Sequence, residues 1–412
     1  MEQNEINDSK LDQAIAKFES EIEKKNEEKI VIDRNDIKKL IAMLPNGKSS
    51  GFSEASNEMF KYGTSNTLIH LISALIEKII NSGIIPSFFN VGKISPIIKD
   101  PNKSKSDYNN VRPITVSDTL TNIYKKIVLI ELDKTHCGSP NQFGFANKSS
   151  CNHAVFALKE TILNTIKKNK AVYAVAIDAS KAFDKINRKN LFHTLIGKIK
   201  PIIWRSLKNY YRCSMAYIEK EGEISEIFKT TIGVKQGGPL SPKLFAIYIE
   251  ELVELVEKEN LGIKIQDLQI GIILYADDII ILSDDEKKIQ RALEICEEFG
   301  SKKEIKFNPD KTQLISLNAI GVLGINDKNL KTKIKVQLYK TYCRPILSYG
   351  CEALKINQID QRKLKTIEGT IIKRIMGLGK RAKTTKLLHA LEMETTEIML
   401  LKGKLNFVKR LM

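Results

Sequence analysis

The sequence predicts an α+β fold in which antiparallel strands are flanked by helices. Three observations support this fold class. Residues 172–177 (VYAVAI) are a continuous apolar run rich in β-branched residues, which indicates a buried strand. Two hairpin patterns follow, one around Glu221-Gly222 and one around the aspartate pair of LYADDIIIL. On both sides of these strands apolar residues recur at helical spacing, so we expect helices to cover the sheet.

The part of the chain before the buried strand is predicted to be mostly helical. Residues 5–30 are dense in charge and carry apolar side chains every three or four positions, which is typical of a solvated, peripheral amphipathic helix. Turn signals such as Pro45-Asn46-Gly47 separate the segments that follow. These segments are expected to be helices at residues 36–44, 64–81, 118–132 and 152–168 and a strand at 94–99.

After the buried strand, helices and strands are expected to alternate. Asn187 is expected to cap one helix and Pro201 to begin another. The arms around the aspartate pair are expected at 270–274 and 279–282. The remaining expected elements are helices at 241–258 and 284–300, a strand-like stretch at 304–317 with a break at Pro309, and mostly basic helices at 328–412.

The chain is strongly basic, with 66 Lys and Arg against 49 Asp and Glu and a formal net charge of +17. Residues 321–412 hold 20 basic and 7 acidic residues, whereas residues 1–36 hold 6 and 11. A basic region of this kind indicates a polyanionic partner, with nucleic acid favoured over an anionic membrane surface. An AT-rich coding sequence, which enriches Lys, Asn and Ile, is the alternative explanation.

Several classes of protein are disfavoured. The six cysteines include no C-x-x-C pair, so the sequence predicts neither a zinc knuckle nor a disulfide framework, and reduced thiols are expected. The start, MEQNEINDSK, is polar and acidic, unlike a signal peptide. The apolar stretches are short, and the one at 68–80 contains Glu77, so no membrane-spanning segment is expected. We therefore expect an intracellular protein of the cytoplasm or nucleus.

The stretch LYADDIIIL places two aspartates side by side within an apolar segment. Burying carboxylates is costly unless a cation or another partner compensates. A tight turn between the two short arms is expected to lift Asp277 and Asp278 to the exposed tip of a hairpin. Taken alone the pair is a weak signal, because solvated Asx-type turns have the same pattern.

A third carboxylate changes this interpretation. Asp178, in AVAIDASKAFD, follows the buried strand directly, so its side chain is expected at the sheet edge near a neighbouring hairpin tip. Alone, Asp178 would be interpreted as an N-cap for the next segment. Carboxylates from two adjacent strands can instead hold two Mg²⁺ ions, one activating a 3′-hydroxyl and the other the leaving pyrophosphate. The three aspartates therefore predict a nucleotidyl-transfer site.

The sequence resembles the reverse transcriptases, and among them those of non-LTR (LINE-type) retrotransposons. The similar blocks follow the family's order over residues 37–316, and the ordered set is highly specific. The blocks are KSSGFSEAS with FKYG, KISPIIKDPNKSKSDYNNVRPITV, NQFGFANKSS, AIDASKAFDKIN, GVKQGGPLSPKLFAIYIEEL, LYADDIIIL and NPDKT. The later segments LYKTYCRPILSYGCEAL and RKLKTIEGTIIKRIMGL are similar to the basic helical region that follows the polymerase in such elements.

The resemblance implies a right-hand polymerase with an antiparallel-sheet palm flanked by helices, helical fingers, and a basic, mostly helical C-terminal region. It implies that Asp178, Asp277 and Asp278 bind Mg²⁺, with Mn²⁺ as a substitute. The backbone carbonyl of Ala179 is implied as a further metal ligand. Phe183 matches the aromatic steric gate that rejects a 2′-hydroxyl, which points to DNA synthesis.

Further residues match the family's nucleotide-binding positions. Gln236 and Gly237 stand where the backbone approaches the nascent base pair, and a loop feeding a helix is the alternative. Lys99 and Arg112 match positions that grip the triphosphate, although both residue types are also common surface cations. Lys311 matches a lysine proposed to protonate the departing pyrophosphate, and the alternative is a solvated hairpin lysine.

Three domains are expected: a charged helical N-terminal extension (1–35), the reverse transcriptase fingers and palm (36–318), and a basic helical region (319–412). The last of these is a shortened thumb or a post-polymerase segment. The interval AIGVLGINDKNLKTKIKVQLYKTY is short for the family. Either Val322-Leu323-Gly324 is the primer-gripping hairpin, or the hairpin and much of the thumb are missing. No endonuclease domain or zinc knuckle is recognised, so a polymerase fragment is expected.

The favoured function is an RNA-directed DNA polymerase (a reverse transcriptase, hence a nucleotidyltransferase) of retrotransposon origin, which extends a primer 3′-OH by a two-Mg²⁺ mechanism. The expected partners are an RNA template, a DNA primer and deoxynucleoside triphosphates, with no membrane, and the sequence gives no indication of the oligomeric state. The short thumb interval leaves open a catalytically impaired, nucleic-acid-binding remnant. An RNA-dependent RNA polymerase is disfavoured by the bulky aromatic residue at position 183.

Overall fold

The computed structural model contains two compact units, and neither corresponds to one continuous stretch of sequence. The first comprises Met1–Pro140, Ala179–Val253 and Glu297–Phe307, and the second Asn141–Asp178, Glu254–Cys296 and Asn308–Met412. The residues that the structure describes are 2–24, 27–104, 107–146, 149–168, 170–179, 183–309, 312–316, 335–336, 339–340, 344, 357–376, 378–379 and 383–411.

Helices make up most of the first unit. α4 (Asn66–Ser82) begins after Ser65, whose hydroxyl accepts a hydrogen bond from Leu68 N at 3.2 Å. It ends at Gly83, whose φ of +69° favours glycine. The other helices of this unit are α1 (Glu2–Lys24), α2 (Arg34–Ala42), α3 (Asn57–Tyr62), the 3₁₀ helix η1 (Tyr108–Asn110), α5 (Thr119–Thr135), α7 (Arg188–Leu195), α8 (Pro201–Arg212), most of α9 (Ser241–Lys258) and the end of α10 (Glu286–Lys303).

The first unit also contains a five-stranded sheet. β1 pairs antiparallel with β2 and parallel with β4, and β4 pairs antiparallel with β5 and β6. The hairpin predicted around Glu221-Gly222 is confirmed: both residues have positive φ, 53° and 87°, as in the two-residue turns that suit the twist of paired strands. The strands are β1 (Val91–Ile98), β2 (Val111–Ser117), β4 (Met215–Lys220), β5 (Glu223–Ile224) and β6 (Phe228–Lys229).

The N-terminal helix α1 packs against this unit. Ile15 and Ile22 are buried, and the Phe18 ring lies edge-on to Trp204 with the centroids 5.0 Å apart. Two ion pairs, at 2.8 and 2.6 Å, join α1 to α7 and α8. The helix is amphipathic as predicted, but its apolar side is not solvated, because that side covers the indole of Trp204.

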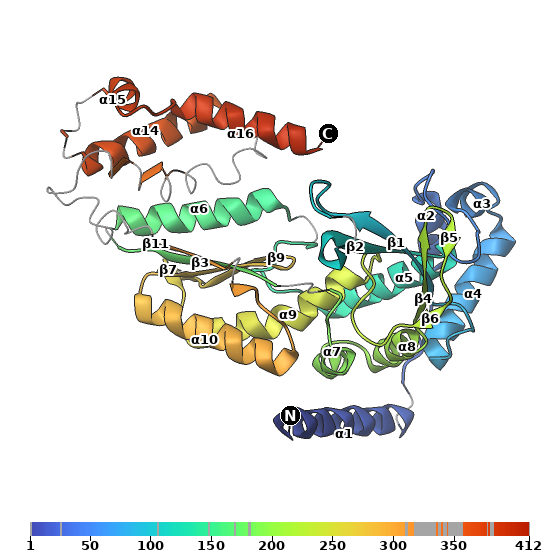
Figure 1. Ribbon diagram of the computed structural model, residues 1–412. Helices are drawn as coiled ribbons and strands as arrows, with labels where there is room; N and C mark the ends of the chain where they lie inside the picture. The colour runs from blue at the N-terminus through green and yellow to red at the C-terminus, as the bar shows by residue number, and fades with distance from the viewer. Residues whose placement is uncertain are drawn as a thin grey trace. The chain divides into compact units, whose positions relative to one another are not determined.

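The second unit is built on a four-stranded antiparallel sheet with the order β11-β3-β10-β9. Figure 1 shows α6 along one face of this sheet and α10 along the other. Ala154 of α6 packs with Val172, Ala174 and Leu282 in a buried apolar cluster. The elements are α6 (Cys151–Lys167), β3 (Tyr173–Asp178), β7 (Ile263–Ile265), β8 (Leu268–Ile270), β9 (Ile272–Tyr275), β10 (Asp278–Ser283), the first part of α10 and β11 (Gln313–Ser316).

Near the end of the chain lie α14 (Gln358–Ile375), α15 (Thr384–Ala390) and α16 (Thr396–Leu411). Glu368 of α14 is only 1% exposed and accepts hydrogen bonds from Arg344 Nε at 2.8 Å and Thr396 Oγ1 at 2.6 Å. This buried carboxylate therefore ties α14 to the start of α16. The predicted hairpin Val322-Leu323-Gly324 lies outside the described residues.

Most predicted helices and strands are present, with ends that differ by a few residues. Two differ more: the helix predicted at 5–30 ends at Lys24, and within the strand-like stretch 304–317 only β11 is an extended strand among the described residues. α3, β2, β7 and β8 were not predicted. Across the described part of the chain, no helix combines the length and the apolar character needed to cross a bilayer.

Candidate active site

Asp178, Asp277 and Asp278 come together at one end of the second unit's sheet. Asp178 is the last residue of β3 and Asp278 the first of β10, and the antiparallel register places them directly opposite each other. Asp277 stands beside Asp278, in the two-residue turn that it forms with Ala276 between β9 and β10. Asp278 therefore belongs to the strand, whereas both aspartates were predicted at the turn tip. Asp178 and Asp277 are half-buried and Asp278 is exposed, so solvent reaches all three carboxylates.

A buried glutamine, which the sequence analysis did not single out, fixes this turn. Ala276 has a φ of +59°, a conformation that is costly for a residue with a Cβ. Gln142 is 7% exposed, and its Oε1 accepts hydrogen bonds from Ala276 N at 3.1 Å and Gly144 N at 2.9 Å. A Cβ on Gly144 would lie 2.2 Å from Ala276 N, so only glycine fits there. The block NQFGF thus supports the aspartate hairpin.

Ala179 and the NPDKT block meet where β3 ends. Asn308 N donates a hydrogen bond to Asp178 O at 2.9 Å, and Ala179 forms an isolated antiparallel bridge with Phe307. These contacts fix the backbone on both sides of the Asp178-Ala179 peptide. Lys311, predicted in the same block, lies outside the described residues.

In the first unit the structure brings Phe183, Gln236 and Gly237 together. Val234 N donates to Phe183 O at 2.8 Å, so the two segments lie side by side. Gly237 has a φ of +92°, and a Cβ there would lie 3.2 Å from Thr115 O of β2. The backbone conformation therefore favours glycine, and a Cβ would also make a tight contact with β2.

Lys99 and Arg112 lie at the loop end of the β1–β2 hairpin, and both side chains are exposed. Lys99 N donates to Asn110 O at 2.8 Å, which closes the hairpin. Arg112 and Ile114 share one face of β2, because side chains alternate along a strand. Ile114 Cγ2 lies 3.4 Å from the place that a Cβ on Gly237 would take. Arg112 therefore lies on the same face of β2 as Ile114, which approaches Gly237. The loop that contains Gln236 and Gly237 is called the glycine loop below.

The predicted residues thus fall into two groups. The three aspartates belong to the second unit, and Phe183, Gln236, Gly237, Arg112 and Lys99 belong to the first. Along the chain, the groups are joined by the short segment that leads from Asp178 to Phe183.

Two buried lysines, also missed in the sequence, lie next to the glycine loop. Lys235 Nζ donates to Asn90 O at 3.0 Å, to Asn90 Oδ1 at 2.5 Å and to Met215 O at 3.3 Å. Lys125 Nζ donates to Ser117 Oγ at 2.6 Å. Burial lowers the pKa of Lys235 to about 6 and the pKa of Lys125 to about 7. Lys235 therefore ties the loop to Asn90, directly before β1, and to Met215 of β4.

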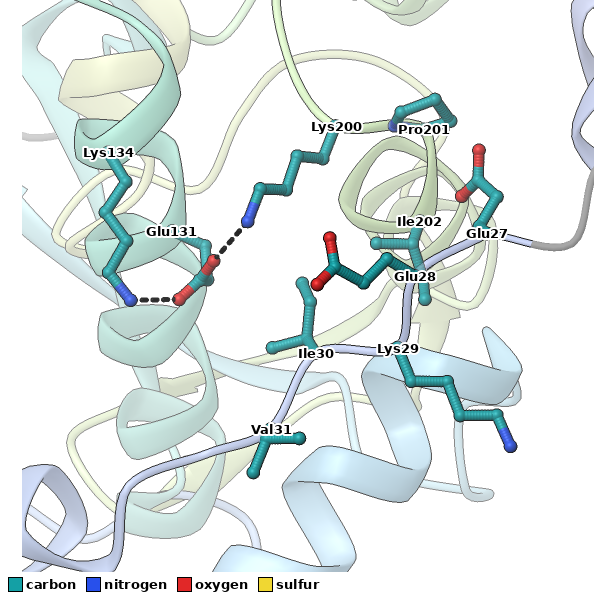
Figure 2. Close-up of a pocket in the computed structure, with 10 residues that line it drawn as sticks. All are labelled: Glu27, Glu28, Lys29, Ile30, Val31, Glu131, Lys134, Lys200, Pro201 and Ile202. Carbon is teal, nitrogen blue, oxygen red and sulfur yellow. Dashed lines mark hydrogen bonds and ion pairs between the residues drawn. The ribbon is translucent and has the colours of Figure 1, made fainter.

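A pocket of about 650 Å³ opens elsewhere in the first unit, and Figure 2 shows its lining. The Glu131 carboxylate accepts hydrogen bonds from Lys134 at 2.6 Å and Lys200 at 3.1 Å. Burial opposes ionisation, but these two lysines together lower the pKa of Glu131. Lys200 precedes α8, so the contacts tie α5 to the start of α8. None of the predicted site residues lines the pocket, and we do not assign it to the active site.

The aspartates provide a donor set that suits a divalent cation. Among the described residues, no three His, Cys, Asp or Glu side chains are close enough to enclose a metal ion. Asp178 and Asp278 are nevertheless a direct cross-strand pair, with Asp277 next to Asp278 in the chain. Carboxylate oxygens are the ligands that Mg²⁺ prefers, so these three side chains suit a divalent cation chemically.

Comparisons with known proteins identify a family that this chain resembles. The family model for reverse transcriptase (RNA-dependent DNA polymerase) matches residues 99–381. A retrovirus-related Pol polyprotein from a type-2 retrotransposable element of Drosophila melanogaster is 28% identical over 48% of this chain and 19% of its own length. The RNA-directed DNA polymerase from mobile element jockey of Drosophila funebris is 21% identical over 69% of this chain and 32% of its own length.

The similarity to a solved structure is more distant. Apo telomerase from Candida tropicalis, truncated from its C-terminal domain, has 17% sequence identity to this chain and a TM-score of 0.43. The match covers 57% of this chain and 51% of that one. The chain spans only 19% to 32% of the length of the two curated relatives described above.

Proposed function

The chain belongs to the reverse transcriptase family, in its non-LTR retrotransposon type, and we propose that it is an RNA-directed DNA polymerase. It adds deoxynucleotides to a primer 3′-hydroxyl, which makes it a nucleotidyltransferase. The observation that carries the proposal is the register of β3 and β10, which sets Asp178 opposite Asp278, the neighbour of Asp277 in the chain.

Asp178, Asp277, Asp278 and the carbonyl of Ala179 are the proposed ligands of Mg²⁺, for which Mn²⁺ can substitute. When bound, Mg²⁺ activates the 3′-hydroxyl and neutralises charge on the departing pyrophosphate. The chain itself supplies a fixed set of carboxylates, since the strand register aligns two of them and Gln142 holds the turn that carries the third. Lys311 is the proposed proton donor to pyrophosphate.

The first unit is proposed to hold the incoming nucleotide. Phe183 lies beneath its sugar and excludes ribonucleotides by overlap with a 2′-hydroxyl. The loop at Gln236 and Gly237 is proposed to approach the nascent base pair. Lys99 and Arg112, both exposed cations, bind the triphosphate.

At the level of the chain, we propose a right-hand polymerase with an N-terminal extension (1–35), fingers and palm (36–318) and a basic C-terminal region (319–412). The proposed partners are an RNA template and a DNA primer, and the net charge of +17 supports a polyanionic partner. Such substrates place the proposed activity inside the cell, in the cytoplasm or nucleus. Of the interval that raised the alternative of an impaired remnant (319–342), the structure describes only residues 335–336 and 339–340.

Incubation of the chain with a primed homopolymer RNA, Mg²⁺ and a labelled deoxynucleotide tests the proposal. Asp277→Asn should abolish incorporation and also the rise in melting temperature that Mg²⁺ produces by binding the native state. Asp267→Asn is a matched control, because Asp267 occupies the same second position in the two-residue β7–β8 turn, after Gln266 with a φ of 53°. The control should keep full activity.

Two outcomes would contradict the proposal. Incorporation that is equal in the parent and in Asp277→Asn removes the aspartates from the chemistry. A parent chain that binds primer-template but incorporates nothing is a nucleic-acid-binding protein without polymerase activity.

A further inference from the structure

Asp184, the residue after the proposed gate Phe183, holds the side chain of Gln236. Gln236 Nε2 lies 2.8 Å from both Oδ1 and Oδ2 of Asp184. An ionised carboxylate only accepts hydrogen bonds, so the amide nitrogen of Gln236 must face it. The other end of the amide, the acceptor Oε1, is consequently turned away from Asp184.

The segments that carry Asp184 and Gln236 are joined at further points. Gly233 N donates to Ile186 O at 2.8 Å, and Arg188 Nε donates to Gly233 O at 2.9 Å. Gly233 has a φ of +72°, and a Cβ there would lie 2.5 Å from Asp184 O. Glycine alone allows this approach, so residues 184–188 and the loop that begins at Gly233 are in direct contact.

On its other side, Gln236 is tied to the first unit's sheet. Thr115 N of β2 donates to Gln236 O at 2.9 Å, and the neighbouring Lys235 is anchored on Asn90. The backbone of Gln236 is therefore fixed by the strand that carries Arg112, while its side chain is oriented by Asp184.

We propose that Asp184 is a positioning residue for nucleotide selection. It sets the Gln236 amide so that the Oε1 acceptor, together with the Phe183 ring, is presented to the incoming nucleotide. An acceptor in this place is complementary to a hydroxyl or amino group of the nucleotide. The inference rests on the proposed function, which assigns Phe183 and Gln236 to the nucleotide. Asp184 itself touches no substrate and acts through Gln236.

Asp184→Asn keeps the size of the side chain but replaces an acceptor with a donor, so the Gln236 amide can turn over. The KM for a deoxynucleotide on a primed RNA should rise about tenfold, as expected when a hydrogen bond to a charged group is lost, with a smaller change in kcat. The preference for deoxynucleotides over ribonucleotides in kcat/KM should fall. Gln236→Glu should have the same effects, because the new carboxylate at position 236 would face and repel the carboxylate of Asp184.

The double variant Asp184→Asn with Gln236→Glu rebuilds the pair with donor and acceptor exchanged, and it again presents an acceptor to the nucleotide. Its KM should return to within about threefold of the parent, a non-additivity that a merely structural role of either residue does not produce. Asp12→Asn is the control, since Asp12 is an exposed carboxylate paired with Lys189 at 2.8 Å near the same segment, and it should leave KM unchanged.

Unchanged KM and selectivity in Asp184→Asn, or no recovery in the double variant, overturns the proposal. If the parent does not polymerise, the proposed function fails. The positioning role of Asp184 is then tested by equilibrium binding of dATP to the Mg²⁺-loaded protein with primer-template. Binding about tenfold tighter in the parent than in Asp184→Asn supports the proposal. Equal affinity overturns it, and no binding by the parent overturns both.

Discussion

The ring of Phe183 lies against Phe245, with the centroids 4.9 Å apart and the planes tilted by 35°. Phe245 is 1% exposed, whereas Phe183 is half-buried, so one side of the Phe183 ring is held by the core. A ring supported in this way cannot yield, because protein interiors are close-packed. Rigidity of this kind is what a steric gate against a 2′-hydroxyl needs.

Phe183→Val should raise kcat/KM for ribonucleotides far more than it lowers kcat/KM for deoxynucleotides. The physical reason is that the substitution removes a clash with the wrong substrate rather than a contact to the right one. Both values are measured on one RNA template. Phe192→Val, in a residue 4% exposed beside Trp204, should destabilise the fold by about 1–3 kcal/mol without changing selectivity. An unchanged selectivity ratio in Phe183→Val would remove the gate from the mechanism.

Lys235 makes folding stability depend on pH. Burial, with the nearby charges of Lys125 and Arg188, lowers its folded-state pKa from 10.5 to about 6. Between these values the unfolded chain binds the extra proton, so this residue's contribution to stability rises as pH rises and is lost toward pH 6. Lys235→Met should reduce the slope of unfolding free energy against pH by about 1.4 kcal/mol per unit between pH 7.5 and 9, measured by denaturant titration. An equal slope in Lys235→Met and in the surface control Lys48→Met would show that Lys235 is charged in the fold.

At the scale of elements, the β9–β10 hairpin depends on a segment outside it. Phe143 N donates to Leu274 O and Leu274 N to Asn141 O, both at 2.8 Å, so an isolated parallel bridge joins Gln142 to Leu274 of β9. The side chain of Gln142 then reaches the turn. This segment therefore supports both an arm of the hairpin and the turn at Asp277.

Gln142→Leu should leave Ala276 N without an acceptor inside the protein, at a cost of about 1–3 kcal/mol in unfolding free energy. The turn at Asp277 is then free to shift, so polymerisation should fall at least tenfold even at temperatures where the variant is fully folded. Primer extension and thermal unfolding, measured on the same preparation, test this expectation. A variant that loses stability but keeps its activity would show that the turn holds its shape without Gln142.

At the scale of the whole molecule, the features that the sequence predicted are those with local causes. Asn187 caps α7 by accepting hydrogen bonds from Lys189 N and Asn190 N, and Pro201 begins α8, as expected from residue type alone. Asp178 and the aspartate pair were recognised from a strand, a hairpin and a family pattern.

The features that were missed depend on partners far along the chain. Gln142 meets Ala276 across 134 positions, and Lys235 meets Asn90 across 145. Neither contact produces a periodic pattern in the sequence, because one polar side chain in a loop is compatible with many partners. Burial of the apolar side of α1 was missed for a related reason, since a charge-rich amphipathic pattern does not reveal what covers its apolar side.

Exposed charge, rather than total charge, should determine how the whole chain binds nucleic acid. Each cation that neutralises a phosphate releases a counterion, so loss of one contact to duplex flattens the slope of log K against log salt by about 0.9. Replacing four exposed cations near the end of the chain by Gln should flatten this slope for a primer-template. The four residues are Arg362, Lys363, Arg374 and Lys386. A matched control removes the same charge from exposed residues of the first unit: Arg34, Lys38, Lys39 and Lys78. The control should leave the slope unchanged, and equal flattening in both variants would assign the effect to net charge alone, without a duplex-binding surface at α14 and α15.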